Sequence, residues 1–255
     1  MNGIISASRG RQMKLWRLIE YNSNNPRMNL AVEEAILRCL LEYDAPNTIR
    51  IWQNSPSVIV GYFQDPKEIV DLVACRELGI DVARRISGGG AVYHDYGNLN
   101  YSIFVKKNTL EDRLRVIVED VEKSYSVFCR GIIECLRALG VEAYNLKGNI
   151  LVKGKKVSGS AQHRLYDAIL HHGTLMVNVN MRTLGQVLRI SNPKETLINL
   201  SEALPNKISI NEIKNALKSG FEKAFGINLI GGSLSREEYY LARKLLKIKY
   251  SQKLY

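Results

Sequence analysis

The chain has 255 residues, and 36 Lys and Arg against 25 Asp and Glu give a formal net charge of +11. With 45% apolar and 24% charged residues, the composition excludes a disordered chain, a collagen-like chain and a disulfide-rich miniprotein. No run approaches the roughly 18 to 20 apolar residues of a membrane span, so no membrane partner is expected. The charge favours binding to polyanions or acidic proteins.

Residues 1–13 are predicted to form a flexible N-terminal extension. The segment carries Arg9 and Arg11 without an apolar stretch behind them, which argues against a secretory signal. Four cysteines are scattered without a CxxC pair, which predicts buried, reduced thiols and a cytoplasmic protein: Cys39, Cys75, Cys129 and Cys135.

The expected elements alternate along the chain. Strands are predicted over 14–20, 47–52, 57–61, 81–85, 91–93, 99–105, 143–154, 155–162 and 168–179. Helices are predicted over 29–42, 67–78, 109–139, 209–225 and 235–249, with Gly79 and Gly140 as C-caps and capping boxes at 209–212 and 235–238. We expect hairpins at 53–56 and 153–154. The pattern predicts an α+β fold, a mixed and largely antiparallel sheet flanked by helices.

The strongest local signal is the segment from Arg84 to Tyr101, RRISGGGAVYHDYGNLNY. Three successive glycines remove every Cβ, so a ligand can approach the main chain and successive N–H groups can hold an anion. Arg84 and Arg85 add planar charged donors suited to phosphate or carboxylate. The alternative is a flexible turn. The segment is neither a P-loop nor a dinucleotide-binding fingerprint.

Two further segments carry polar or charged groups beside small residues. In the stretch from Gly148 to Gln162, Lys156 precedes Ser158, Gly159, Ser160 and Ala161, which leaves room for a ligand near an ammonium group. Spacing alone does not separate Lys156 from Lys153 and Lys155, and a solvated hairpin tip explains those two. The third segment is His171 to Asn178; adjacent histidines point different ways on a strand, so the pair is no metal site.

Together and in this order, these segments resemble the lipoate–protein ligase family of the biotin/lipoate ligase superfamily. The family pattern RRxSGGGAVYHDxGNLNYS matches residues 84–102, KxSGSA matches 156–161, and HHGTL matches 171–175. Residues 29–34 are similar to the family's first helix. The resemblance implies a catalytic domain over 14–230, followed by a basic C-terminal helix and tail over 231–255.

The resemblance also implies a reaction and its residues. Lipoate and ATP, with Mg²⁺, form lipoyl-adenylate, and a lysine of an acceptor lipoyl domain then attacks it; the acceptors are 2-oxoacid dehydrogenase E2 or glycine cleavage H proteins. Lys156 is the implied catalytic residue and, with Gly89, contacts lipoate. The implied nucleotide or lipoyl-adenylate site comprises Arg85, Ser87, Gly88, Gly89, Gly90, Ala91, Val92, Tyr93, His94, Asn149, Ser158, Gly159, Ser160, Ala161, His172, Gly173 and Thr174.

The sequence departs from the family pattern in two places. Asn149 stands where many members carry an aspartate, and a neutral amide is a weaker Mg²⁺ ligand than a carboxylate. Only 29 residues follow Gly226, where longer ligases have an accessory domain. Either the helix over 235–249 suffices or a separate small accessory protein supports activation, and we expect the accessory protein.

Four alternatives stay open at this stage. An octanoyl or lipoyl transferase places a reactive cysteine just before the KxxGSA strand, and residues 140–155 contain none. The GRGRxG loop of biotin ligases is absent. A nucleic-acid-binding protein accounts for the charge but not for the three ordered motifs. A non-catalytic lipoate carrier is compatible with Asn149.

Overall fold

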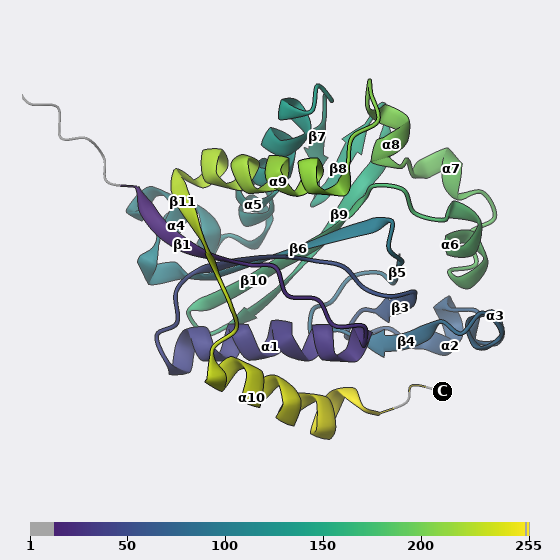
Figure 1. Ribbon diagram of the computed structural model, residues 1–255, viewed down its shortest axis with the longest axis horizontal. Coiled ribbons are helices and arrows are strands. Elements are labelled where there is room, and N and C mark those ends of the chain that lie inside the picture. The colour runs from purple at the N-terminus through teal and green to yellow at the C-terminus, as the bar shows by residue number, and fades with distance from the viewer. Residues whose placement is uncertain (1–12, 253, 255) are drawn as a thin grey trace, which may run out of the picture.

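The computed structural model describes residues 13–252 and 254, and an eight-stranded sheet forms its centre (Figure 1). The strand order is β11-β1-β2-β6-β10-β9-β8-β7. β1 pairs in parallel with β11 and β2, and the other neighbours are antiparallel, as expected for a mixed sheet. The strands are β1 (Lys14–Ile19), β2 (Thr48–Trp52), β6 (Asn98–Lys106), β7 (Tyr144–Leu146), β8 (Asn149–Val152), β9 (Lys155–Leu165), β10 (Ala168–Met176) and β11 (Ile227–Gly232).

Helices cover both faces of this sheet (Figure 1). On one face α5 (Val121–Ala138) packs beside α9 (Ile210–Phe225), and on the other α1 (Pro26–Glu42) packs beside α10 (Arg236–Leu245) and the π-helical turn η2 (Leu246–Tyr250). Alternation along β6 separates the two faces: Leu99 and Tyr101 join the core under α5 and α9, whereas Phe104 joins the core under α1.

Two glycines allow α5 and α9 to approach closely. A Cβ at Gly131 would lie 2.1 Å from the Phe221 ring, and one at Gly220 would lie 2.4 Å from the Gly131 carbonyl oxygen. The two helices pack against each other at this contact, and a side chain at either position would force the helix axes apart.

A second sheet of three strands, β4 (Asp81–Arg84), β3 (Ser57–Val60) and β5 (Val92–His94), carries the short helices α2 (Pro66–Ile69) and α3 (Leu72–Glu77). The predicted hairpin of 47–52 with 57–61 is therefore wrong, since β2 and β3 belong to different sheets. The segment between β2 and β3 bonds to other elements instead of forming a hairpin turn. Its Asn54 hydrogen-bonds to Asn29 of α1 and to His94 of β5.

Two predicted helices are each divided by an aspartate that caps a new helix. The 67–78 helix is α2 and α3, with Asp71 accepting from the Ala74 amide at 2.9 Å. The 109–139 helix is η1 (Lys107–Thr109), α4 (Asp112–Glu119) and α5, with Asp120 accepting from the Lys123 amide. Aspartate side chains compete with the backbone for such bonds, which ends the preceding helix.

The predicted 143–154 strand is the tight hairpin of β7 and β8, which turns at Lys147 and Gly148, where φ is 51° and 84°. The next hairpin, β8 with β9, turns at Lys153 and Gly154 as predicted. Edge strand β11 is absent from the predictions, as are three short helices that follow β10: α6 (Met181–Val187), α7 (Pro193–Thr196) and α8 (Leu200–Ala203).

The predicted extension over 1–13 lies outside the described residues except for Met13. The predicted basic tail begins within β11 and continues as α10 and η2, and Lys249 and Tyr250 of η2 both bond to Glu34 of α1. The division at residue 230 stays a prediction. All four cysteines are free and buried, as predicted.

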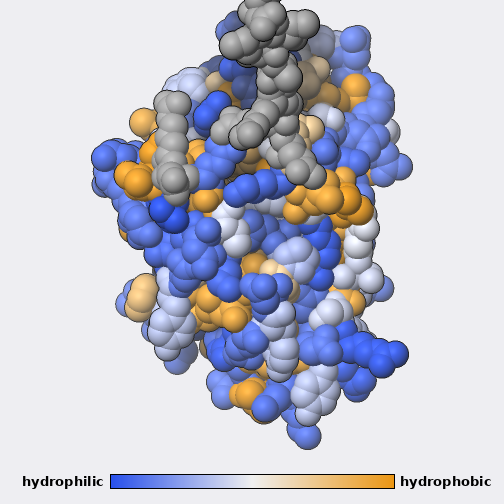
Figure 2. Space-filling view, turned by 90° about the vertical axis from the view of Figure 1, so that its left-hand side faces the viewer, coloured by the Kyte–Doolittle hydropathy of each residue, from blue (hydrophilic) through white to orange (hydrophobic). Residues whose placement is uncertain are grey.

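The described residues contain no helix long and apolar enough to cross a membrane. Figure 2 views the end of the molecule where β1 begins, and there apolar residues are interspersed among polar ones.

Candidate functional site

One row of residues runs across five strands of the large sheet and forms the floor of a cavity. In register, the row is Asn149 of β8, Gly159 of β9, Thr174 of β10, Asn100 of β6 and Trp52 of β2. Directly paired residues share a face of a sheet, so the row faces α1. All five residues line the cavity, which has a volume of about 270 Å³.

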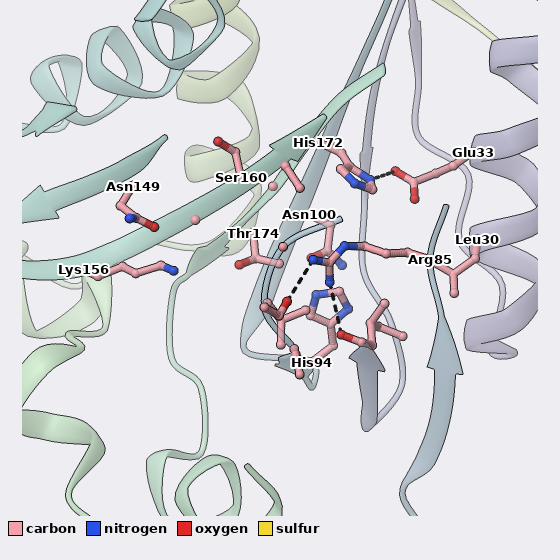
Figure 3. Close-up of a pocket in the computed structure, with 18 of the residues that line it drawn as sticks. Leu30, Glu33, Arg85, His94, Asn100, Asn149, Lys156, Ser160, His172 and Thr174 are labelled. Atoms are coloured by element: carbon pink, nitrogen blue, oxygen red, sulfur yellow. Dashed lines mark hydrogen bonds and ion pairs between the residues drawn. The ribbon is translucent and has the colours of Figure 1, made fainter. Parts of the chain in front are cut away.

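The three motifs meet in this cavity (Figure 3). Fourteen of the predicted site residues line it: Arg85, Gly89, Gly90, Ala91, Val92, His94, Asn149, Lys156, Gly159, Ser160, Ala161, His172, Gly173 and Thr174. Four others do not. Ser87 and Gly88 accept hydrogen bonds from the Arg85 guanidinium. Tyr93 packs into the core of the small sheet, and Ser158 lies on the α5 face near the Tyr101 hydroxyl.

Six lining residues were absent from the predicted set: Leu30, Glu33, Trp52, Ile59, Asn100 and Lys147. A signal existed for Glu33, because it is a carboxylate within the apolar 29–42 pattern that resembles the family's first helix. A charge on a buried helix face requires a partner and therefore marks a polar site.

A β-bulge places Lys156 on the cavity face. Ile150 pairs with Ser158, but Leu151 pairs with Lys156, so Val157 is the extra residue of β9. Without the bulge, Lys156 and Gly159 would face opposite sides, since they are three residues apart. The Lys156 side chain instead lies over Gly159, where an added Cβ would be 2.5 Å from its Cε and 2.6 Å from its Nζ.

The Lys156 ammonium is a cation without a bonding partner in the described part of the chain. Burial lowers its pKa, and repulsion by Arg85 lowers the pKa further. In Figure 3 it points into the cavity beside Asn149. An unpaired, partly desolvated ammonium at the end of a cavity is suited to binding a carboxylate or a phosphate.

Arg85 holds the glycine-rich loop in shape. Its Nη2 donates to the Gly88 and Gly90 carbonyl oxygens at 2.6 and 2.9 Å, and its Nη1 donates to the Ile59 oxygen at 3.2 Å. Its Nε donates to the Ser87 hydroxyl. Four of its five N–H groups therefore bond to the protein. Burial lowers its pKa to about 10, so the group stays charged at neutral pH.

A buried hydrogen-bond network links this loop to α1. His172 bonds through Nδ1 to Glu33 Oε1 at 2.9 Å and through Nε2 to the Ser87 hydroxyl at 2.6 Å. The Ser102 hydroxyl also donates to Glu33 Oε1. Burial acts to raise the pKa of Glu33, but His172, Ser102 and the Arg50 charge outweigh it and lower the pKa. Glu33 is therefore ionised at neutral pH, and His172 Nδ1 is the donor.

The neighbouring histidines have separate roles, as the strand pattern predicts. His171 faces α5 and packs against Phe128, Tyr125 and Tyr101 with ring centroids 5.1, 5.5 and 6.2 Å away. Only His172 reaches the cavity. Burial lowers the pKa of His171 to about 3, so its ring is neutral in the folded protein.

The donor set of the cavity does not by itself fit Mg²⁺. Glu33 is its one lining carboxylate in the described chain and is engaged by His172 and Ser102. No cluster of three His, Cys, Asp or Glu side chains suited to a metal occurs in the described residues. Mg²⁺ prefers carboxylate and phosphate oxygens, and Asn149 offers a neutral amide. The metal role of Asn149 stays a prediction.

A model of the lipoyl protein ligase A/B catalytic domain matches residues 25–222, and the chain belongs to that family of ligases and acyltransferases. The chain is 30% identical to octanoyltransferase LipM of Anoxybacillus flavithermus over an alignment of 274 positions, which covers 94% of this chain and 96% of LipM. It is 32% identical to lipoate-protein ligase A subunit 1 of Thermoplasma acidophilum over 248 residues, covering 89% and 90% of the two chains.

Solved structures agree with this assignment. A lipoate protein ligase from T. acidophilum with bound lipoic acid superposes with a TM-score of 0.83 at 33% identity, covering 94% of this chain and 97% of that one. A lipoate-protein ligase A bound with ATP has a TM-score of 0.84 at 32% identity with the same coverage. The bi-partite lipoate protein ligase of T. acidophilum, studied with its E2 lipoyl domain, has a TM-score of 0.84 at 30% identity, covering 94% of each chain.

Proposed function

We propose that this enzyme is an ATP-dependent lipoate–protein ligase. It activates lipoate to lipoyl-adenylate and transfers the lipoyl group to a lysine of an acceptor lipoyl domain. The observation that carries the proposal is the unpaired Lys156 ammonium at one end of a cavity whose floor crosses five strands. Relatives that bind lipoic acid and ATP share this fold at 32 to 33% identity.

The proposed reaction has two steps. A lipoate carboxylate oxygen attacks the α-phosphorus of ATP, which forms the mixed anhydride and releases pyrophosphate. The acceptor lysine amine then attacks the acyl carbon, which forms the amide, releases AMP and gives up a proton. Negative charge grows on the phosphoryl oxygens in the first step and on the acyl oxygen in the second. We assign the stabilisation of both charges to Lys156, because its ammonium lies over Gly159 in the cavity and has no partner among the described residues.

The glycine-rich loop shapes the opposite wall. Gly90 has no atom within 4 Å of an added Cβ, so the ligand can reach its backbone. Arg85 fixes the loop through the Gly88 and Gly90 carbonyl oxygens, and its remaining N–H is available to a phosphate. Mg²⁺ that accompanies ATP would neutralise charge on the triphosphate.

The cysteines favour the ligase over the acyltransferase. A transfer through a thioester needs an accessible thiol with appreciable thiolate character. None of the four cysteines lines the cavity, and burial raises the pKa of Cys129 and Cys75 to about 11 and of Cys39 and Cys135 to about 12. The similarity to LipM keeps acyl transfer without ATP as the second candidate.

We further propose that activation uses a separate accessory subunit and that the acceptors are E2 or glycine cleavage H-type lipoyl domains. Two relatives support this: the T. acidophilum ligase is bi-partite and was studied with its E2 lipoyl domain, and subunit 1 of that organism's enzyme matches 89% of this chain. The net charge of +11 suits an acidic acceptor, and the affinity for such a domain should fall as salt rises.

One lipoylation assay with three arms tests the proposal. Acceptor domain is incubated with lipoate and ATP, with lipoyl-adenylate alone, or with octanoyl carrier protein without ATP. Product in the first arm identifies a complete ligase, and product in the second arm alone identifies a ligase that needs its partner subunit. Product in the third arm alone would refute the ligase in favour of the transferase.

The variant Lys156→Ala should lose product in the first two arms and keep the fold. The matched control Lys153→Ala alters the exposed turn of the same hairpin and should behave as the parent protein. Transfer from lipoyl-adenylate at the parent rate in Lys156→Ala would overturn the role of Lys156.

A further inference from the structure

The end of the cavity away from Lys156 contains polar groups without partners. Neither Nδ2 nor Oδ1 of Asn100 has a hydrogen bond among the described residues, although the residue is only 1% exposed. The Nε2 of His94, 4% exposed, is unpartnered in the same way. Both residues line the cavity. Buried polar groups are rarely left unpaired, so these groups indicate that an occupant of the cavity supplies their partners.

A chain of hydrogen bonds fixes the proton of His94 on Nε2. The Ser23 amide and Arg50 can only donate, and both donate to Asn29 Oδ1, at 2.9 and 2.8 Å. Asn29 Nδ2 is thereby the donor to Asn54 Oδ1, at 2.7 Å. Asn54 Nδ2 then donates to His94 Nδ1, at 3.0 Å. A neutral ring that accepts at Nδ1 carries its hydrogen at Nε2.

The His94 ring is neutral because burial, helped by the charge of Arg85, lowers its pKa to about 3. Two residues that line the cavity, His94 and Asn100, therefore each carry a buried N–H without a hydrogen-bond partner among the described residues. A hydrogen-bond acceptor within reach of either N–H is favourable, because a buried donor without a partner is costly.

The cross-strand row gives the distance between this end and Lys156. Lys156 lies over Gly159, and Asn100 is two strands further along the row, through Thr174. Two strand spacings amount to about 10 Å. An acyl chain with its carboxylate at Lys156, laid across the strands, ends beside Asn100, His94 and Trp52.

We propose that Asn100 and His94 select an acyl chain that ends in a dithiolane ring over an unsubstituted chain, because their N–H groups hydrogen-bond to the ring sulfurs. Sulfur is a weak acceptor and packs well against aromatic rings such as that of Trp52, whereas a terminal methyl accepts no hydrogen bond. Octanoate offers these N–H groups no acceptor, so they stay buried and unpaired when it binds. The inference rests on the proposed function, which places the acyl group in this cavity.

Binding calorimetry without ATP tests the selection with three acids: lipoate, octanoate and 5-cyclopentylpentanoate. The last has the shape of lipoate but carries carbon in place of sulfur. We expect lipoate to bind about tenfold more tightly than either of the other acids, as for one or two buried donors left unpaired. Binding of the cyclopentyl acid within about twofold of lipoate would overturn the proposal, since shape alone would then account for the preference.

The variant Asn100→Leu tests what the Asn100 amide contributes to the preference for lipoate. It breaks no hydrogen bond of the described residues, so the melting temperature should hold while the lipoate preference falls toward unity. The control Thr174→Val alters the same row nearer Lys156 and should change the affinity for all three acids alike. An unchanged preference in Asn100→Leu would contradict the role of Asn100, and the same measurement on His94→Phe tests the ring.

The calorimetry tests the selection of the acyl chain, and the lipoylation assay tests the ligase activity, so either proposal can be refuted alone. A lipoate preference without ATP-dependent transfer would refute the ligase but leave the selection intact. Transfer that uses lipoate and octanoate equally well would refute the selection alone.

Discussion

Replacing Gly159 by alanine should displace the Lys156 ammonium while leaving the lysine itself in the sequence. The new Cβ would lie 2.5 Å from Lys156 Cε and 2.6 Å from Nζ, well inside van der Waals contact. Because these atoms are the free end of a flexible side chain, the lysine moves and the backbone does not. The ammonium then leaves its position over the cross-strand row, and the lost charge-assisted hydrogen bond is worth about 1.5 to 3 kcal/mol.

That loss corresponds to a decrease of about 10- to 150-fold in kcat/KM for lipoyl transfer, measured with saturating acceptor domain. The melting temperature should change little, since alanine suits an extended strand better than glycine does. Gly231→Ala is the control: it is also a strand glycine, and no atom lies within 4 Å of its added Cβ. Gly159→Ala with kcat/KM near that of the control would refute the placement of Lys156.

Three further outcomes are expected. Gly89→Val should abolish calorimetric binding of lipoyl-adenylate, because φ is +88° there and the Cβ would lie 3.1 Å from Arg85 Nη2; unchanged binding would contradict the loop geometry. Glu33→Gln should lower stability at pH 7 by about 1 to 3 kcal/mol. Glu33 has a lowered pKa, so its contribution is present above the ordinary value of 4.5 and is lost below it; chemical denaturation should show the two proteins converging only under acid conditions. His171→Phe should reduce acid sensitivity between pH 6.5 and 3, since the unfolded chain binds a proton in that window and the folded protein does not, which costs about 1.4 kcal/mol per pH unit; equal slopes in both proteins would refute this.

The sequence motifs could identify the site because their residues are fixed by local chemistry. Some features can be recognised without knowing which distant segments pack together. They are the glycine run, the lysine beside small residues and the histidine on a strand. The selection of Lys156 from its neighbours could not be made in this way. It depends on the bulge at Val157, which exists only in the pairing of β8 with β9.

The failures of prediction have the same physical origin. Residues 53–56 have the composition of a hairpin turn, but Asn54 bonds to α1 and β5, and the two flanking strands enter different sheets. Asn100 gave no signal because its role depends on standing in register with Thr174 and Trp52. Pairings between distant segments decide both cases, and periodicity reports only local preference.

The floor of the cavity also has a consequence for folding. Its five residues come from strands that span positions 52 to 174, so no short fragment of the chain contains the whole binding surface. Closing such distant pairings is slow in comparison with forming helices, and binding competence therefore appears late, with the central sheet complete. A ligand bound to this row stabilises only the fully paired sheet, so it should slow amide exchange in β2 and β8 alike.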